Sequence, residues 1–171
     1  PSSPTPYLII TTEALAQAAA ALADYRVTTN HDVQVVSLAE LPLEPDALLA
    51  EVHALLLATH QDGLPSYLVL LGDAGDAADD LIPALPCEND LGGCYTDNRY
   101  GDLDGDRVPD VAVGRIPAHT AAQARAYLEK VQRHETQTAP GLWNRRFILY
   151  ASLSGFGDAV EALLEFVMLE G

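Results

Sequence analysis

The feature that most constrains the fold is a regular alternation of short apolar runs with segments of helical periodicity. Five apolar runs stand out, at 7–10 (YLII), 33–38 (VQVVSL), 67–72 (YLVLLG), 111–114 (VAVG) and 147–152 (FILYAS). Runs of this kind are typical of strands buried on both faces, and intervening helices join such strands in parallel. We therefore expect one α/β domain over residues 1–171, with three layers and a mostly parallel sheet that helices cover on both faces.

Two segments between and after these runs carry helix signals. In PDALLAEVHALLLATH, the leucines and Val52 repeat at the spacing of one helix face, and Pro45 and Asp46 suit a first helical turn. In HTAAQARAYLEKVQRHE, Thr120 and Gln123 have the spacing of a capping box. We expect a helix in each segment.

Residues 73–110 interrupt the alternation. This segment is rich in Gly, Pro, Asp and Asn, and it is longer than an ordinary connection between a helix and a strand. A long irregular segment inside a compact domain is typical of a functional or ion-organised excursion. We expect it to be an acidic calcium-loop excursion from the sheet.

The sequence DLDGDRVPD, near the end of this excursion, places carboxylates at alternate positions. The predicted calcium ligands are Asp102, Asp104, Asp106, the carbonyl of Val108, and Asp110. Alternate residues of a tightly curled loop can direct their oxygens at one hard cation, which offsets the repulsion between carboxylates. The match to an EF-hand is partial, because Arg107 stands at the usual glycine position and Val113 at that of the bidentate glutamate. A solvated acidic turn without an ion is the alternative.

The net charge restricts the choice of partners. Nine Lys and Arg residues against 25 Asp and Glu residues give a formal net charge of −16. Such a surface repels phosphate backbones and anionic lipids, so we expect no nucleic-acid and no membrane partner. Cations are favoured partners, although an acid excess also promotes solubility by itself.

Cys87 and Cys94 bracket a short loop. A disulfide between them would suit a secreted protein. Two unpaired buried thiols are the alternative, because two cysteines are too few to define a disulfide framework. We expect no zinc site, since no second pair of Cys or His stands at ligand spacing.

Charged residues follow two of the apolar runs, at the sheet edge where open α/β folds bind their ligands. Asp73 follows YLVLLG and Arg115 follows VAVG. A charged residue at this edge binds a ligand or, more often, closes the sheet edge through an ion pair. For Arg115 the expected partner is Asp73 or Asp97.

The residues reveal no catalytic constellation. The histidines are scattered and none lies in an H-E-x-x-H motif; they are His31, His53, His60, His119 and His134. There is no G-x-S-x-G elbow and no evident Cys/His nucleophile pair. The G-x-G of SGFGDAVE is a weak dinucleotide signal, because Asp158 and Glu161 equally fit a helix N-cap and its partner.

Taken in order, YLVLLGDAGD, YTDNRYGDLDGDRVPDVAVGRIPAHTAAQARAYLEKVQRHE and FILYAS resemble the gingipain-like cysteine peptidases. The resemblance implies a caspase-like, Rossmann-like half domain, since it covers the amino-terminal part of such a catalytic domain. It also implies that the nucleophilic Cys and its partner His lie on later strands, beyond Gly171. The chain begins PSSPTP without Met, so we expect it to be part of a longer protein.

The resemblance further assigns a possible substrate contact to Asp158. In the arginine-specific members, an acidic residue in the loop after the strand matching FILYAS pairs with the substrate's guanidinium, and Asp158 has a comparable place. We therefore expect part of a secreted or cell-surface cysteine endopeptidase, stabilised by Ca²⁺ and inactive alone. Its partners would be the remainder of the catalytic domain and, through the parent enzyme, protein substrates. The alternative is a non-catalytic, calcium-dependent binding or adhesion module.

Overall fold

The computed structural model describes residues 3–59, 66–76, 79–87 and 93–137, together with 141, 145 and 146. Contacts divide the chain into two compact units, Pro1–Thr136 and Gln137–Gly171. The helices and strands below belong to the first unit, apart from the last residue of α3. The expected organisation as a single domain stays a prediction. The predicted strand at 147–152 lies outside the described residues.

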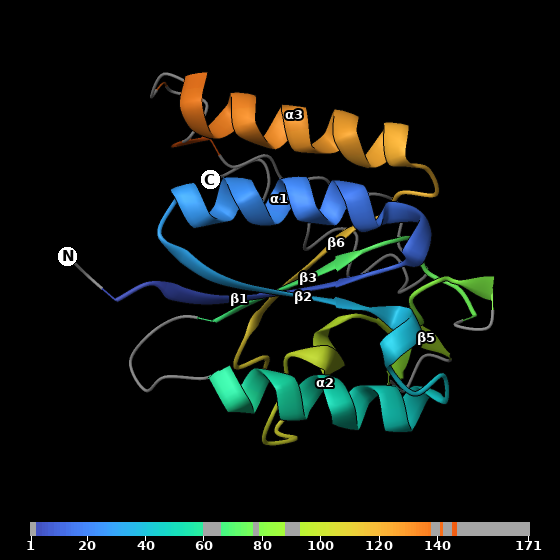
Figure 1. The fold of residues 1–171 in the computed structure, drawn as a ribbon. Helices are drawn as coiled ribbons and strands as arrows, with labels where there is room; N and C mark the ends of the chain where they lie inside the picture. Colours follow the sequence, from blue (N-terminus) through green and yellow to red (C-terminus); the bar gives the residue numbers. More distant parts are fainter. Residues whose placement is uncertain are drawn as a thin grey trace, which may run out of the picture. The chain divides into compact units, whose positions relative to one another are not determined.

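A parallel sheet forms the middle of the first unit (Figure 1). Its strands are β1 (Thr5–Thr11), β2 (His31–Ser37), β3 (Tyr67–Leu71) and β6 (Ala112–Ile116), in the order β2-β1-β3-β6. All three strand pairs are parallel. The sheet thus confirms the predicted fold class, and the four apolar runs in the described residues all lie in or beside these strands.

Helices cover both faces of the sheet. Helices α1 (Ala16–Thr28) and α3 (Ala121–Gln137) lie on one face and α2 (Pro45–Thr59) on the other (Figure 1). Alternate strand residues supply two cores. Tyr7, Ile9 and Leu71 pack with the buried residues of α1 and α3, whereas Leu8 and Leu70 pack with those of α2. This division explains why the strands are apolar almost without a break.

The helix signals of the sequence are confirmed. Leu48, Val52 and Leu56 of α2 are buried at one-turn spacing. At the start of α3, the Gln123 side chain accepts a hydrogen bond from the N–H of Thr120 (3.2 Å), and the Thr120 hydroxyl accepts one from the N–H of Gln123 (3.3 Å). The predicted capping box therefore forms. No described helix is long and apolar enough to cross a membrane.

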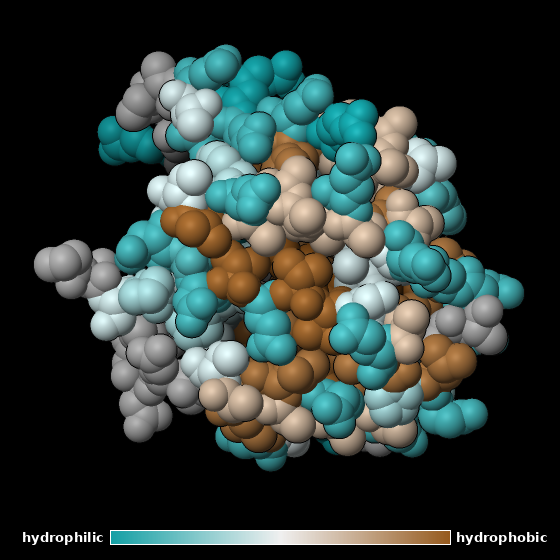
Figure 2. Space-filling view, viewed as in Figure 1, coloured by the Kyte–Doolittle hydropathy of each residue, from teal (hydrophilic) through white to brown (hydrophobic). Residues whose placement is uncertain are grey.

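Strand β2 forms one edge of the described sheet, and its surface is partly apolar. In Figure 2, hydrophobic residues gather across the middle of the view, where β2 crosses Figure 1. Val35 of β2 is 42% exposed, and only Val36 of this strand is buried. The near-continuous apolar pattern of this segment therefore overstates its burial, because an edge strand has a neighbour on only one side.

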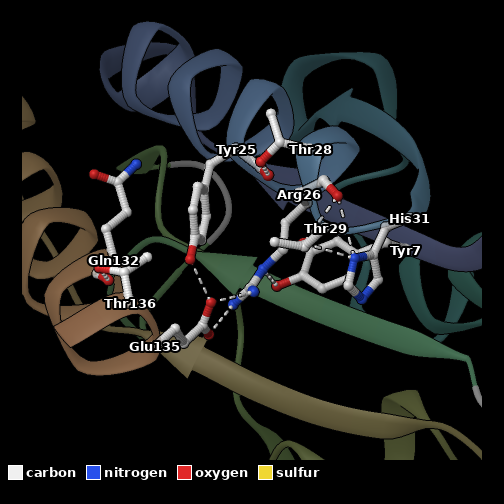
Figure 3. Close-up of polar contacts among 9 residues, drawn as sticks. All are labelled: Tyr7, Tyr25, Arg26, Thr28, Thr29, His31, Gln132, Glu135 and Thr136. Carbon is white, nitrogen blue, oxygen red and sulfur yellow. Dashed lines mark hydrogen bonds and ion pairs between the residues drawn. The ribbon is translucent and has the colours of Figure 1, made fainter. Parts of the chain in front are cut away.

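A polar cluster joins the carboxyl-terminal parts of α1 and α3 (Figure 3). Arg26 donates to both carboxylate oxygens of Glu135, at 3.0 Å each, and the Tyr25 hydroxyl donates to Glu135 at 2.7 Å. Arg26 also donates to the Tyr7 hydroxyl at 3.3 Å, which connects the pair to the start of β1. Burial by itself raises the pKa of Glu135, but the hydrogen bonds from Arg26 and Tyr25 outweigh it, so this pKa lies below its ordinary value. The cluster therefore fixes α3 on the sheet while Glu135 is ionised.

Candidate functional site

The carboxyl edge of the sheet contains a topological switch point between β1 and β3. From β1 the chain leads through α1 to β2 on one side, and then through α2 back to β3 on the other. Open α/β folds bind ligands in the crevice at such a point. In this protein the fully buried side chain of Ile82 packs closely against Gly72, at the end of β3. A Cβ atom added to Gly72 would lie only 3.1 Å from Ile82 Cδ1 and 3.0 Å from Thr12 Cγ2. The described part of the crevice is therefore filled by the chain's own excursion.

Arg115 holds this excursion against the sheet. Its Nε and Nη2 donate to the two carboxylate oxygens of Asp97, at 2.8 and 2.7 Å. The remaining donors reach backbone carbonyls of the excursion and of the end of β3, namely those of Gly72, Ile82 and Pro83, at 3.1, 3.1 and 3.4 Å. Its side chain is only 10% exposed. All five guanidinium N–H groups thus have acceptors, which is the pattern of a structural anchor rather than of a ligand site.

Asp73 does not pair with Arg115, which was one of the two pairings expected from the sequence. Its carboxylate contacts Nε2 of His119, with which it forms an ion pair when this histidine is protonated, and it also accepts a hydrogen bond from the N–H of Ala74 at 2.8 Å. Of the two expected partners of Arg115, the structure therefore selects Asp97. His119 follows β6, so the pair joins the ends of β3 and β6 at the carboxyl edge.

Tyr100 joins the excursion to the core beneath the sheet. Its side chain is fully buried, and its hydroxyl donates to the carbonyl of Pro83 at 2.8 Å. Burial is the main cause that raises the pKa of Tyr100 to about 12; the charge of Arg115 lowers it and that of Asp97 raises it. Tyr100 is therefore neutral at physiological pH, and its neutral form donates the hydrogen bond.

The acidic loop is tightly curled, as the calcium hypothesis requires. The carboxylate of Asp102 accepts hydrogen bonds from the N–H groups of Gly105 (2.9 Å) and Arg107 (3.1 Å). Asp104 accepts one from Asp106 (3.1 Å), and Asp106 accepts one from Val108 (2.7 Å). One carboxylate oxygen from each of these three aspartates lies within 4.8 Å of the others.

The fifth predicted ligand has another contact. Asp110 is outside the group of three carboxylates and accepts a hydrogen bond from the N–H of Leu103 at 2.8 Å. At the base of the loop, the N–H groups of Asp110 and Val111 donate to the carbonyl of Gly101, at 2.8 and 3.1 Å. A Cβ on Gly101 would lie 2.6 Å from the Val111 carbonyl oxygen, so this closure requires glycine.

Arg107 adopts the backbone conformation of the residue that it replaces in the EF-hand pattern. Its φ is +75°, close to the +80° of Gly105, and both values lie in the left-handed region. Residues other than glycine pay a steric cost there. The loop therefore curls at Arg107 as it would at a glycine.

The cysteines form the disulfide that was one of the two alternatives. Cys87 and Cys94 are bonded to each other and face each other across an antiparallel hairpin of β4 (Leu85–Cys87) and β5 (Cys94–Thr96). The sequence contains only these two cysteines. No thiol of this chain is thus left to act as a nucleophile.

Asp158 and Glu161, like His60, lie outside the described residues.

Asn98–Tyr100 forms a short 3-10 turn directly after the YTD segment, and this turn brings Arg99 toward α2. Neither this turn nor the β4–β5 hairpin could be predicted from the sequence, because both are too short to show periodicity.

Three solved structures illustrate the proteins whose fold is similar to that of this chain. One, described only as a protease, has a TM-score of 0.63 and 21% identity over 79% of this chain and 29% of its own. Dimeric latent PorU from Porphyromonas gingivalis has a TM-score of 0.62 and 22% identity, over 92% of this chain and 18% of its own. The Arg-specific cysteine proteinase gingipain R (RgpB) has a TM-score of 0.60 and 17% identity, over 76% and 28%. At these identities the likeness establishes the fold, and the chain spans less than a third of each of these proteins.

A comparison with models of protein families identifies the family of the chain, which similarity of fold alone does not. No curated protein matches the chain significantly. The model of peptidase family C25, however, matches residues 1–167, which is nearly the whole chain. This match confirms the resemblance inferred from the order of the strands, the YTDN segment and the acidic loop. The chain belongs to peptidase family C25.

Proposed function

We propose that this chain is the amino-terminal part of the catalytic domain of a gingipain-like cysteine endopeptidase. The family match over residues 1–167 carries the proposal. In such an enzyme a thiolate attacks the carbonyl carbon of a peptide bond and is activated by a neighbouring histidine. Because both cysteines of this chain are in a disulfide, the thiol must come from elsewhere in the protein.

The described residues would act as the scaffold for that chemistry. Arg115, Asp97 and Tyr100 hold the excursion at the carboxyl edge of the sheet, where α/β folds carry their sites. Rigid support of this kind keeps neighbouring loops in the geometry that a reaction needs. Asp158 is our candidate for contacting a substrate guanidinium, as a carboxylate that accepts a bidentate pair.

The test compares the isolated chain with the longer parent protein. We expect the 171-residue chain to leave casein intact and the parent to hydrolyse it. Iodoacetamide should abolish the parent's activity, because alkylation removes the nucleophilic thiolate. A parent carrying Cys87→Ser and Cys94→Ser is the matched control, and its residual activity should be equally sensitive. Absence of hydrolysis would instead favour the non-catalytic binding module, and hydrolysis that resists iodoacetamide would contradict a cysteine nucleophile.

We also propose that the acidic loop binds Ca²⁺ through Asp102, Asp104 and Asp106, with the Val108 carbonyl and Asp110 completing the set. The donor set fits a hard cation, since it contains oxygens only and three carboxylates lie within 4.8 Å of one another. The left-handed backbone at Gly105 and Arg107 supports the same interpretation, because it curls the loop around one centre. The bound ion would fix the loop at the start of β6.

Calcium should raise the melting temperature of the protein. At one hundred times its dissociation constant, a ligand adds about 2.7 kcal/mol of stability, which corresponds to roughly 5 to 10 °C for a chain of this size. Asp104→Asn keeps the hydrogen-bond acceptor for Asp106 but removes a charge, so we expect it to lose at least half of the shift. Asp24→Asn, on the exposed side of α1, is the matched control and should keep it. An equal shift in both variants, measured by thermal denaturation with calcium and with EGTA, would contradict the site.

We further propose an extracellular or cell-surface location. The disulfide supports it, because such bonds persist in oxidising compartments. An acidic surface with a calcium loop is compatible with the calcium levels outside cells. The proposed partners are the remainder of the catalytic domain and protein substrates of the complete enzyme.

A further inference from the structure

Strand β2 has a neighbour on only one side among the described residues. In the sheet order β2-β1-β3-β6 it pairs with β1 alone, in register from its first residue to its last. We call the side of β2 that faces away from β1 the open edge. An edge of this kind is a template on which another chain can add a strand.

The register shows which backbone groups of β2 face the open edge. In a parallel pair, every second residue of a strand bonds to the neighbouring strand, and the residues between them face the other side. The N–H of Thr5 donates to the carbonyl of Asn30 at 3.1 Å, although Thr5 lies opposite His31. Asn30 and the even-numbered residues after it therefore face β1. The N–H and C=O groups of Val33 and Val35 face the open edge.

A contact at the end of β2 supports this assignment. The outward N–H of Ser37 donates to the carboxylate of Glu40 at 3.3 Å, within the capping box of the turn that follows. The chain itself therefore closes this end of the edge. Among the described residues, no group pairs with the outward N–H and C=O of Val33 and Val35. These two residues thus offer donors and acceptors to a partner strand.

Strand β2 lacks the features that protect edge strands in other proteins. Such edges carry lysine, proline or a bulge, and these prevent pairing with other chains. Residues 31–37 contain no lysine and no proline, and their pairing with β1 is continuous. The backbone of the open edge is therefore ready to accept a strand.

The face of the open edge beside α1 is apolar. Val33 packs with the core under α1, and Val35, two residues on, points to the same face and is 42% exposed. Tyr25 of α1 contacts Glu135 of α3. Val27 lies about 200° around the helix from Tyr25, so it faces away from α3, and it is 60% exposed. A partner strand would meet this apolar surface, part of the hydrophobic region in the middle of Figure 2.

The opposite face of the open edge is acidic. Asp32 is exposed and, as an even-numbered residue, points to the face that α2 covers. Residues 31–59 contain no lysine or arginine and five carboxylates, all exposed: Asp32, Glu40, Glu44, Asp46 and Glu51. Residues 60–65, outside the described part of the chain, add Asp62 and no basic side chain. The charge of this region favours a basic partner, and it opposes a second copy of a chain whose net charge is −16.

We propose that the open edge of β2 binds an extended segment of another protein as an added strand, and that this segment alternates apolar and basic residues. The main-chain groups of Val33 and Val35 hold the segment. Its apolar side chains pack on Val35 and Val27, and its basic side chains face Asp32 and the carboxylates of the α2 side. Main-chain hydrogen bonds give the affinity in this mode, and alternate side chains give the specificity. The site does not depend on the peptidase activity of the parent protein.

The test is a titration of the purified chain with labelled peptides as long as β2, followed by fluorescence anisotropy. One peptide alternates lysine and valine, and its matched control alternates glutamate and valine. We expect the lysine peptide to bind about tenfold more tightly or better, because only its charge complements the edge. Equal binding of the two peptides, or binding of neither at millimolar concentration, would overturn the proposal.

N-methylation distinguishes strand addition from attraction between opposite charges. An added strand directs only every second N–H at β2. Of two lysine peptides, one methylated on the valine nitrogens and the other on the lysine nitrogens, one should therefore bind about tenfold more weakly than the other. Equal binding of the two methylated peptides would show that charge alone attracts them, and would contradict strand addition.

Variants locate the site. Val35→Pro removes an outward N–H and keeps the bonds between β2 and β1, so it should weaken the lysine peptide about tenfold, with an unchanged circular dichroism spectrum. Asp32→Asn keeps the backbone and should weaken the same peptide about threefold. Asp79→Asn, the same change in the excursion, is the matched control and should have no effect. Unchanged binding in both β2 variants would contradict the assignment.

Two further outcomes would assign the open edge to another occupant. If the lysine peptide binds the 171-residue chain but not the parent protein, the parent's own chain covers the edge. If analytical ultracentrifugation shows a dimer of the free chain that Val35→Pro dissociates, a second copy covers it. Either result would overturn the proposal of a basic partner.

Discussion

Replacing Tyr100 with alanine should lower the free energy of unfolding by about 4 kcal/mol. Among the residues that the structure describes, Tyr100 has the largest fully buried side chain, and it packs in the core between the sheet and α2. Truncation removes its apolar contacts and leaves a cavity that the surrounding strands cannot fill. It also removes the donor that bonds the Pro83 carbonyl. Urea denaturation followed by circular dichroism measures the change.

One further variant separates the cost of the lost hydrogen bond from the cost of the cavity, and another is the control. Tyr100→Phe removes only the hydroxyl and should cost about 1 kcal/mol. Tyr127→Ala, on a side chain that is 40% exposed, should change stability by less than about 0.5 kcal/mol and is the control. A loss for Tyr100→Ala no larger than for Tyr127→Ala would show that the excursion does not depend on this anchor.

Tyr100 also determines how the protein responds to alkali. Its pKa rises from 10.0 to about 12 in the folded protein, so folding favours the neutral hydroxyl. This contribution is fully present below pH 10, the ordinary pKa, and is lost as the pH rises through about 12. The fall in stability over this interval should therefore be shallower in Tyr100→Phe, which has no proton to lose at this site.

Replacing Arg115 with methionine should cost about 3 kcal/mol. The substitution keeps most of the aliphatic stem but removes five hydrogen bonds, and it leaves the carboxylate of Asp97, only 24% exposed, without its partner. A poorly hydrated charge without a partner is the main source of the cost. Arg125→Met on the exposed face of α3 is the matched control and should have little effect.

A double variant tests whether the ion pair is the cause. Adding Asp97→Leu to Arg115→Met removes the orphaned charge, so part of the lost stability should return. Denaturant midpoints of the four proteins in this cycle give the coupling free energy. If the second substitution only adds to the first, the carbonyls of Gly72, Ile82 and Pro83, rather than Asp97, account for the role of Arg115.

The contacts of Tyr100 and Arg115 explain how the irregular excursion can give rigid support to neighbouring loops. The excursion contains few residues in regular structure, yet Ile82, Leu85 and Tyr100 are fully buried. Arg115 satisfies the carbonyls that the excursion brings under the sheet edge, which would otherwise be costly to bury. Loops that carry catalytic or binding residues need such rigid support.

Much of the fold followed from the sequence. The apolar runs predicted β1, β2, β3 and β6, and the helical periodicity and capping residues predicted α2 and α3, because these patterns reflect burial on one face or on both. The acidic spacing also predicted that Asp102, Asp104 and Asp106 come together, since alternate residues of a curled loop point inward. The order of these pieces was sufficient to indicate the peptidase family.

Other features depended on how distant segments meet. The choice of Asp97 over Asp73 as the partner of Arg115 depends on the path of the excursion, which local sequence preferences do not fix. The disulfide depends on the β4–β5 register, which sets Cys87 opposite Cys94. Local patterns thus determined which residues are strand, helix or loop, whereas pairings between residues far apart in the chain were decided by tertiary packing, because only packing brings their side chains within bonding distance.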